Sequence, residues 1–380
     1  MFFITKQDPN YTVKGSRDPL GFQVIWQAAG RQLIPHLSTV SGNIKDFQIL
    51  STAHFYKNEF EMEDSVFDAF FILFEQLMAY TRYSTYGNEG FNGIDRVKKV
   101  FTGSIKEVKI SHQDQILSNQ KAYGIWGKYI RPFTDMGFKE SNLFDDIYNE
   151  KAGNNADLER QVSTLRKKGV GETSVVSLQK LPAFASILSK PEALEKELYV
   201  SKLLNDHCEG ELLNIFSVKP TLKKLSSFYE LLAALDSASP NPRFKAVLQF
   251  IYNTEKVLSP LSRIFRYLQT SSFWKRTEIE SNEYIGAWRS SVDTSGFSTD
   301  LKGLAELFNL SNWDLVQGLV QRNENVCAGR GSAPWIRVSA SGIEMNHFEG
   351  AFFREDYDPG VHCDNTYFFN TYINLHNKLN

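Results

Sequence analysis

The chain has 380 residues, of which 42% are hydrophobic and 23% are charged, a composition typical of a water-soluble globular protein. Its formal net charge of −2 excludes a protein that coats nucleic acid by electrostatics alone, because such affinity comes from neutralising many phosphates. Three cysteines without CxxC spacing favour a reducing compartment and argue against a disulfide framework or a cysteine zinc site. We therefore expect a cytoplasmic protein without a cofactor. No basic n-region or long apolar run is visible, so no membrane partner is expected.

The N-terminal region predicts several helices in succession. Asp18, Pro19 and Gly21 occupy favoured positions of a type I turn, from which a helix with one apolar face runs towards Pro35. A second helical pattern covers 44–56. The strongest pattern follows an acidic run at 59–64, where apolar side chains recur at helical spacing from Phe67 to Thr81. We expect a mostly helical N-terminal domain over residues 1–151.

The amino-acid sequence of the segment 15–37 resembles that of uncharacterised proteins encoded in multi-gene bacterial antiphage defence operons. This resemblance covers a small part of the chain and carries no catalytic motif. It implies a place in a multi-protein assembly.

A polar, glycine-containing stretch between Asn149 and Gly171 predicts a domain boundary. Beyond it, helical segments such as 222–235 and 244–257 each show an apolar stripe. Prolines and a glycine divide these segments: Pro182, Pro191, Gly210, Pro220, Pro240, Pro242 and Pro260. We expect a central helical bundle over 172–296, and a C-terminal docking segment over 351–380 with a possible strand at 367–375.

The stretch 298–348 predicts two short helices and a hairpin. Leu301, Leu304, Ala305 and Phe308 share one face of the first helix, and Ser311 can cap the second. Trp313, Val316, Leu319 and Val320 form the apolar stripe of that second helix. After a glycine-rich loop at 327–333, residues 335–339 and 343–347 alternate as two strands around a turn.

This order of elements resembles a winged-helix domain, which we assign to residues 297–350. The resemblance implies that the second helix can enter a DNA major groove. Gln317, Gln321 and Arg322 would then meet DNA from its outward side, with Arg337 on the wing and Arg330 before it. Asp314 argues against this use, because a carboxylate at the start of a recognition helix repels phosphate, so a protein ligand is the alternative.

A second candidate nucleic-acid surface mixes aromatic and basic residues. It consists of Arg263, Arg266, Trp274, Lys275 and Arg276. Cationic side chains can hold phosphates while rings stack on bases, which suits single strands. The alternative is a solvated face whose aromatic residues belong to the core.

Two further motifs are weak. Gly329, Arg330 and Gly331 could form a backbone nest for an anion, but the lysine and the strand of a P-loop are missing. His347, His362, Cys327 and Cys363 lack the paired spacing of zinc ligands, so we expect no metal site. No motif for nucleophilic catalysis is present.

The sequence thus predicts a mainly α protein: a helical N-terminal region and a helical bundle, followed by a C-terminal winged-helix-like unit carrying a β-hairpin. We expect a non-enzymatic DNA-engaging or scaffolding subunit of a bacterial multi-protein assembly, plausibly in antiphage defence, with other protein subunits and DNA as partners. The alternatives are a nuclease whose site is assembled from scattered carboxylates, and a purely protein-binding adaptor.

Overall fold

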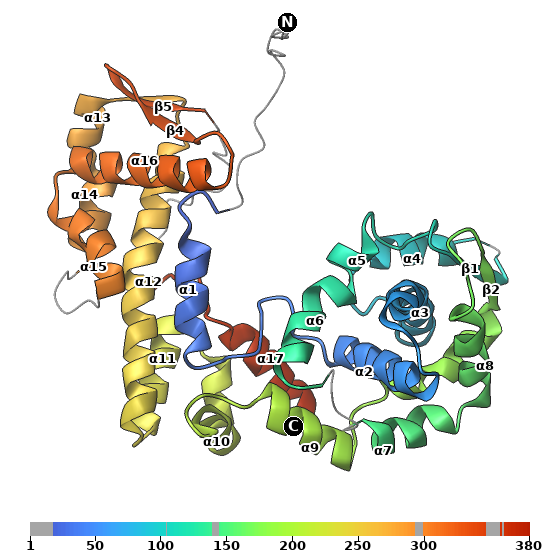
Figure 1. The fold of residues 1–380 in the computed structure, drawn as a ribbon. Helices are drawn as coiled ribbons and strands as arrows, with labels where there is room; N and C mark the ends of the chain where they lie inside the picture. The colour runs from blue at the N-terminus through green and yellow to red at the C-terminus, as the bar shows by residue number, and fades with distance from the viewer. Residues whose placement is uncertain (1–17, 104, 139–143, 293–298, 347–357, 359–360) are drawn as a thin grey trace, which may run out of the picture. The chain divides into compact units, whose positions relative to one another are not determined.

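The computed structural model describes residues 18–103, 105–138, 144–292, 299–346, 358 and 361–380. It is mainly α-helical, as the sequence predicts, and contains two small antiparallel sheets (Figure 1). The chain divides into two compact units. Unit 1 combines residues 1–35 with 206–367, and unit 2 combines 36–205 with 368–380. The four domains predicted from the sequence stay a prediction.

Unit 2 is built around helix α2. Its elements are α2 (Ile44–Glu59), α3 (Asp64–Tyr86), α4 (Ile94–Phe101), β1 (Glu107–Ile110), α5 (Gln120–Tyr123), α6 (Ile125–Asp135), α7 (Asp145–Tyr148), η1 (Asn149–Gly153), α8 (Ala156–Leu165), β2 (Ser174–Ser177), η2 (Leu178–Leu188), α9 (Ala193–Leu203) and α17 (Phe369–Leu379). Every α2 residue from Asp46 to Tyr56 is buried, so this helix is covered on all sides. Strands β1 and β2 pair antiparallel.

The C-terminal segment differs from one expectation. The possible strand at 367–375 is wrong, because α17 occupies 369–379. Phe369, Tyr372, Leu375 and Leu379 are buried at intervals of three and four residues, which is the period of a helix rather than of a strand. The side chain of Thr371 donates to Ser38 O at 2.9 Å and fixes the helix within unit 2.

Unit 1 contains one long helix, α12, and a three-stranded sheet. Its elements are α1 (Phe22–Arg31), α10 (Glu211–Val218), η3 (Pro220–Lys224), α11 (Phe228–Ala238), α12 (Pro242–Leu268), β3 (Phe273–Lys275), α13 (Arg276–Glu280), α14 (Glu283–Ser290), α15 (Thr299–Ala305), η4 (Glu306–Asn309), α16 (Asn312–Gly329), β4 (Ile336–Val338) and β5 (Gly342–Met345).

Two helix boundaries in unit 1 differ from the sequence prediction. The segment 222–235 is not one helix, because Ser227 caps α11 by accepting from Glu230 N at 3.4 Å. Pro260 does not end a helix, since α12 continues through it to Leu268. Leu258, Leu261 and Ile264 are fully buried around this proline, and their packing compensates for the missing hydrogen bond.

The C-terminal helices and the described part of the hairpin form close to where the sequence places them, and residue 347 of the predicted second strand lies outside the described residues. Ser311 caps α16 by accepting from Asp314 N at 3.1 Å, and the predicted apolar faces of α15 and α16 share one core. Strand β4 pairs antiparallel with β5, Ile336 opposite Met345. The glycine-rich loop begins later than predicted, because α16 extends to Gly329 and buries Cys327.

The sheet has a third strand that the sequence did not reveal. β3 pairs antiparallel with β5 on the side away from β4, so the order in the sheet is β3-β5-β4. Figure 1 shows α16 running beside the hairpin of β4 and β5. The chain order in this part of unit 1 is therefore α12, β3, α13 to α16, β4, β5.

Candidate functional site

Helix α12 forms one wall of the candidate site. The Asn241 side chain caps it by accepting from Arg243 N at 3.0 Å, and Pro242 fits the first turn because no partner is required for its nitrogen. Ser262, Arg266 and Gln269 follow one another at helical spacing on the same side of α12, so all three line one cavity.

The start of α1 forms the facing wall. Gly21 N donates to Asp18 O at 3.1 Å, which confirms the predicted turn. The Asp18 carboxylate then accepts from Phe22 N at 2.9 Å and from Gln23 N at 3.2 Å, and so caps α1. This cap directs Phe22 and Trp26 of the first helical turns to the cavity.

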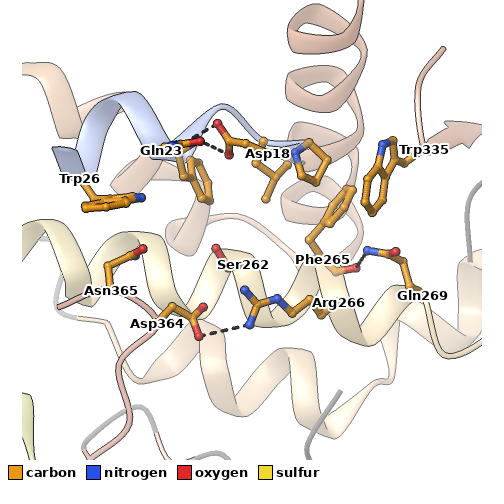
Figure 2. Close-up of a pocket in the computed structure, with 13 residues that line it drawn as sticks. Asp18, Gln23, Trp26, Ser262, Phe265, Arg266, Gln269, Trp335, Asp364 and Asn365 are labelled. Carbon is orange, nitrogen blue, oxygen red and sulfur yellow. Dashed lines mark hydrogen bonds and ion pairs between the residues drawn. The ribbon is translucent and has the colours of Figure 1, made fainter. Parts of the chain in front are cut away.

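Between these walls lies a cavity of about 550 Å³, which we call the α1–α12 cavity. Figure 2 shows the rings of Trp26, Phe265 and Trp335 around it, together with the polar side chains of Arg266 and Asp364. Its volume lies in the range of about 300–1,000 Å³ that small-molecule pockets occupy. All its lining residues belong to unit 1.

Asp364 is the polar centre of the cavity wall. Its Oδ1 accepts from Arg263 Nη2 at 2.7 Å and from Arg266 Nη1 at 3.2 Å, and its side chain is only 6% exposed. Its second oxygen, Oδ2, is buried without a hydrogen-bond partner among the described residues, as is Gln269 Oε1. A buried acceptor without a partner costs about 1–3 kcal/mol, so each of these oxygens is a place where a ligand donor would be stabilising.

The segment 364–367 is held by a buried carboxylate of α12. Glu255 accepts from Asp364 N at 2.5 Å, from Asn365 N and Nδ2 at 3.0 Å each, and from the Tyr367 hydroxyl at 2.8 Å. The cavity wall therefore depends on Glu255, although Glu255 does not line it.

Stability of this wall should depend on pH. Burial raises the pKa of Glu255 to about 7 from 4.5, against the hydrogen bonds, which lower it. The folded protein then binds this proton more tightly than the unfolded chain, so the contribution of Glu255 to stability is full below pH 4.5 and is lost as the pH rises to about 7. Such a shift corresponds to about 3 kcal/mol in the free energy of unfolding.

We expect Glu255→Gln to remove part of this pH dependence, because a neutral amide does not titrate. Urea unfolding measured between pH 5 and pH 8 should show a flatter profile for Glu255→Gln than for the wild type. The exposed Glu230→Gln variant on α11 is the control and should leave the profile unchanged. Parallel profiles for Glu255→Gln and the wild type would show that Glu255 does not change its protonation on unfolding.

The residues of the predicted aromatic and basic surface make separate local contacts. Arg263 and Arg266 both pair with Asp364. Trp274 donates from Nε1 to Leu268 O at 2.6 Å, which fixes its ring against the end of α12. Arg276 donates from Nε to Glu280 at 2.6 Å, while Lys275 at the end of β3 is exposed. Nucleic-acid binding by these residues stays a prediction.

The predicted recognition face of α16 is polar, and Arg322, the one arginine of this helix, is half-buried. Gln321 is exposed and donates to Asn325 at 3.2 Å, and Gln317 is half-buried. Arg322 is not fully exposed as predicted: its Nε donates to Leu20 O at 2.6 Å, and its guanidinium lies 5.0 Å from the centre of the Phe22 ring.

The two arginines of the loop and wing have different surroundings. Arg330 follows α16 and donates to Asp18 O at 2.5 Å and to Asp18 Oδ2 at 3.1 Å. This ion pair joins the end of α16 to the start of α1. Arg337 on β4 is exposed, and it lies opposite Glu344 on β5.

Sequence reasoning missed the residues that assemble the site. No motif or periodic pattern in the sequence marks Asp364 as a site residue. Asn323 of α16 is fully buried and donates to Pro19 O at 2.8 Å, while its Oδ1 accepts from Trp335 N at 2.8 Å. The side-chain amide of Asn323 thus links α16 to the residues before α1 and to Trp335, which precedes β4. A polar residue at a core position of a predicted helix was the only signal available.

No family model matches this chain, and neither a curated protein nor a solved structure is significantly similar to it. Across the described ranges, His, Cys, Asp and Glu side chains form no group of three or more that could hold a metal ion. In those same ranges, no helix has the length and apolar character needed to cross a membrane.

Proposed function

We propose that this protein is a scaffolding subunit of a multi-protein assembly, with a winged-helix-like unit that binds a protein partner. The observation that carries the proposal is the three-stranded sheet β3-β5-β4 beside α16, with β3 preceding the helices and the hairpin following them. Helix–turn–helix and hairpin in this order resemble a winged helix, in which the second helix and the wing are the contact surfaces.

The charge of that surface favours protein over DNA. The outward face of α16 carries Asp314, Gln317, Gln321, Glu324 and Asn325, and so offers two negative charges and three amides. DNA affinity depends on Lys and Arg that neutralise phosphates. The arginines nearest in sequence to this face, Arg322 and Arg330, are engaged with the start of α1.

DNA engagement is the second candidate, because Lys275 and Arg337 are exposed on the two outer strands of the sheet. A role in antiphage defence rests on the resemblance of segment 15–37 alone. A nuclease is a third possibility, and incubating the purified protein with DNA and Mg²⁺ or Mn²⁺ tests it directly.

Site-specific photo-crosslinking tests the protein partner. A photoreactive residue at Gln317 or Gln321 of the full chain, expressed in the cells of origin, should give one discrete protein adduct. The same residue at Gln249, an exposed glutamine on α12, is the matched control and should give none. The DNA alternative predicts instead that Lys275→Ala and Arg337→Ala weaken binding to every DNA sequence alike and each reduce the salt slope by about 1. That result, without a protein adduct, would overturn the scaffolding proposal.

A further inference from the structure

We propose that the α1–α12 cavity binds a single nucleobase, taken either from a free nucleotide or from an unpaired position of a nucleic-acid strand. This inference goes beyond the scaffolding role and does not depend on it, because the outward face of α16 is not part of the cavity. It rests on the walls of the cavity, on one donor and one acceptor beside each other, and on the size of the space.

The walls offer aromatic surface to a planar ligand. Four aromatic residues line the cavity: Trp26 is half-buried, and Phe22, Phe265 and Trp335 are buried. In Figure 2, Trp26 of α1 and Phe265 and Trp335 stand on opposite sides of the polar groups. Every nucleobase has a flat face that stacks on such rings, and aromatic and Arg surfaces are the usual platform for unpaired bases.

The polar groups suit the edge of a base. Arg266 is 40% exposed and uses Nη1 for Asp364, which leaves its other guanidinium hydrogens for an acceptor in the cavity. Asp364 Oδ2, next to it, is an acceptor without a partner among the described residues. The protein thus presents a donor beside an acceptor. The hydrogen-bonding edges of nucleobases carry the complementary pair, an N–H next to a ring nitrogen or carbonyl oxygen.

Other small ligands fit less well. An inorganic anion would satisfy Arg266 but would place negative charge against the Asp364 carboxylate. A zwitterionic amino acid matches the Arg266–Asp364 pair, but an average one has no flat face to stack on the aromatic rings that line the cavity. A nucleotide uses both the polar pair and the aromatic walls.

Isothermal titration calorimetry on the full chain tests the inference. The probes are the four nucleoside 5′-monophosphates, with inorganic phosphate and free tryptophan as representatives of the two other ligand classes. We expect saturable binding of at least one nucleoside monophosphate. A short single-stranded oligonucleotide and a blunt duplex are then added as competitors of the bound nucleoside monophosphate. Competition by the single strand alone identifies an unpaired base of a nucleic-acid strand as a ligand. No competition by either identifies the free nucleotide as the ligand.

Two cavity variants and a control make the test specific. Asp364→Asn keeps one oxygen for the arginines and turns the unpartnered acceptor into a donor, so it should weaken binding roughly tenfold or more. Arg266→Gln should weaken nucleotide binding to a similar extent. Because the Arg266 side chain is half-exposed, this variant replaces Asp364→Asn in the test if Asp364→Asn does not fold. Asp236→Asn, at a side chain of unit 1 that is 49% exposed and does not line the cavity, should bind as the wild type does. Binding of phosphate or tryptophan only, no binding of any nucleotide at millimolar concentration, or equal affinities in cavity variants and wild type would overturn the inference.

Discussion

Replacing Gly342 with alanine should disrupt the three-stranded sheet of unit 1. A methyl group on Gly342 would lie 2.0 Å from Trp274 O and 3.0 Å from the ring of Phe273. β5 is the central strand, so it cannot move away from β3 without disturbing β4. We expect a loss of about 3 kcal/mol or more in the free energy of unfolding, at or above the upper end of overpacking substitutions, because the clash is with backbone. Urea unfolding followed by circular dichroism measures it.

Gly303→Ala is the matched control for this prediction. Gly303 lies in α15, and among the described residues a methyl group there would meet no atom within 4 Å apart from its chain neighbours and the backbone of its own helix. Alanine is a better helix former than glycine, so this variant should be stabilised by up to about 1 kcal/mol. If Gly342→Ala were as well tolerated as Gly303→Ala, strand β3 would not pair with β5, and the observation that carries the proposed function would be lost.

The elements that the sequence predicts best are those whose signal is local. Ser311 caps α16 because a hydroxyl at that position reaches a backbone N–H three residues on, and the hairpin alternates because its two strands are adjacent in sequence. Strand β3 has only three residues, and α13 to α16 and β4 separate it from its partner β5 in the chain. Such a short segment has no periodicity to detect, so the sequence pattern assigns Trp274 and Lys275 to a binding surface instead.

Pro260 illustrates where tertiary packing overrides local preference. A proline in a helix interior costs about 3 kcal/mol, which makes a helix end the better prediction from sequence. Leu258, Leu261 and Ile264 are each fully buried, and burying side chains of this size contributes about 1.5–3 kcal/mol apiece. That burial is available only once the rest of unit 1 has folded.

The candidate site was the least predictable part, because its contacts join distant residues. Arg330 has no acidic neighbour in its own loop, and its partner Asp18 lies 312 positions away. Arg263 and Arg266 are one helical turn apart and read as a solvated or phosphate-binding face, whereas Asp364 lies about 100 positions further on, 98 from Arg266. Residue type and spacing show which residues are basic, but the acid that each one pairs with depends on the tertiary fold.

In unit 2, removing Arg82 should cost more stability than removing any exposed arginine. Arg82 Nη1 donates to Asp46 Oδ1 at 2.8 Å, and the two side chains are only 2% and 6% exposed. Burial raises the pKa of Asp46, while the guanidinium of Arg82 lowers it. Arg82→Met would leave the carboxylate buried without its cation, so we expect a loss of about 3–5 kcal/mol in urea unfolding at pH 7.

A double-mutant cycle distinguishes this stranded charge from lost packing. Arg82→Met combined with Asp46→Leu removes both charges, so it should be clearly more stable than the sum of the two single losses predicts. The exposed pair Arg160 and Asp157, 3.1 Å apart with side chains 74% and 56% exposed, is the matched control, and Arg160→Met should cost less than about 1 kcal/mol. Equal costs for Arg82→Met and Arg160→Met would contradict the prediction. If the double variant were only as stable as the sum of the two single losses predicts, the stabilisation would come from the packing of the Arg82 side chain instead. The Arg82 guanidinium lies 4.9 Å from the centre of the Phe91 ring.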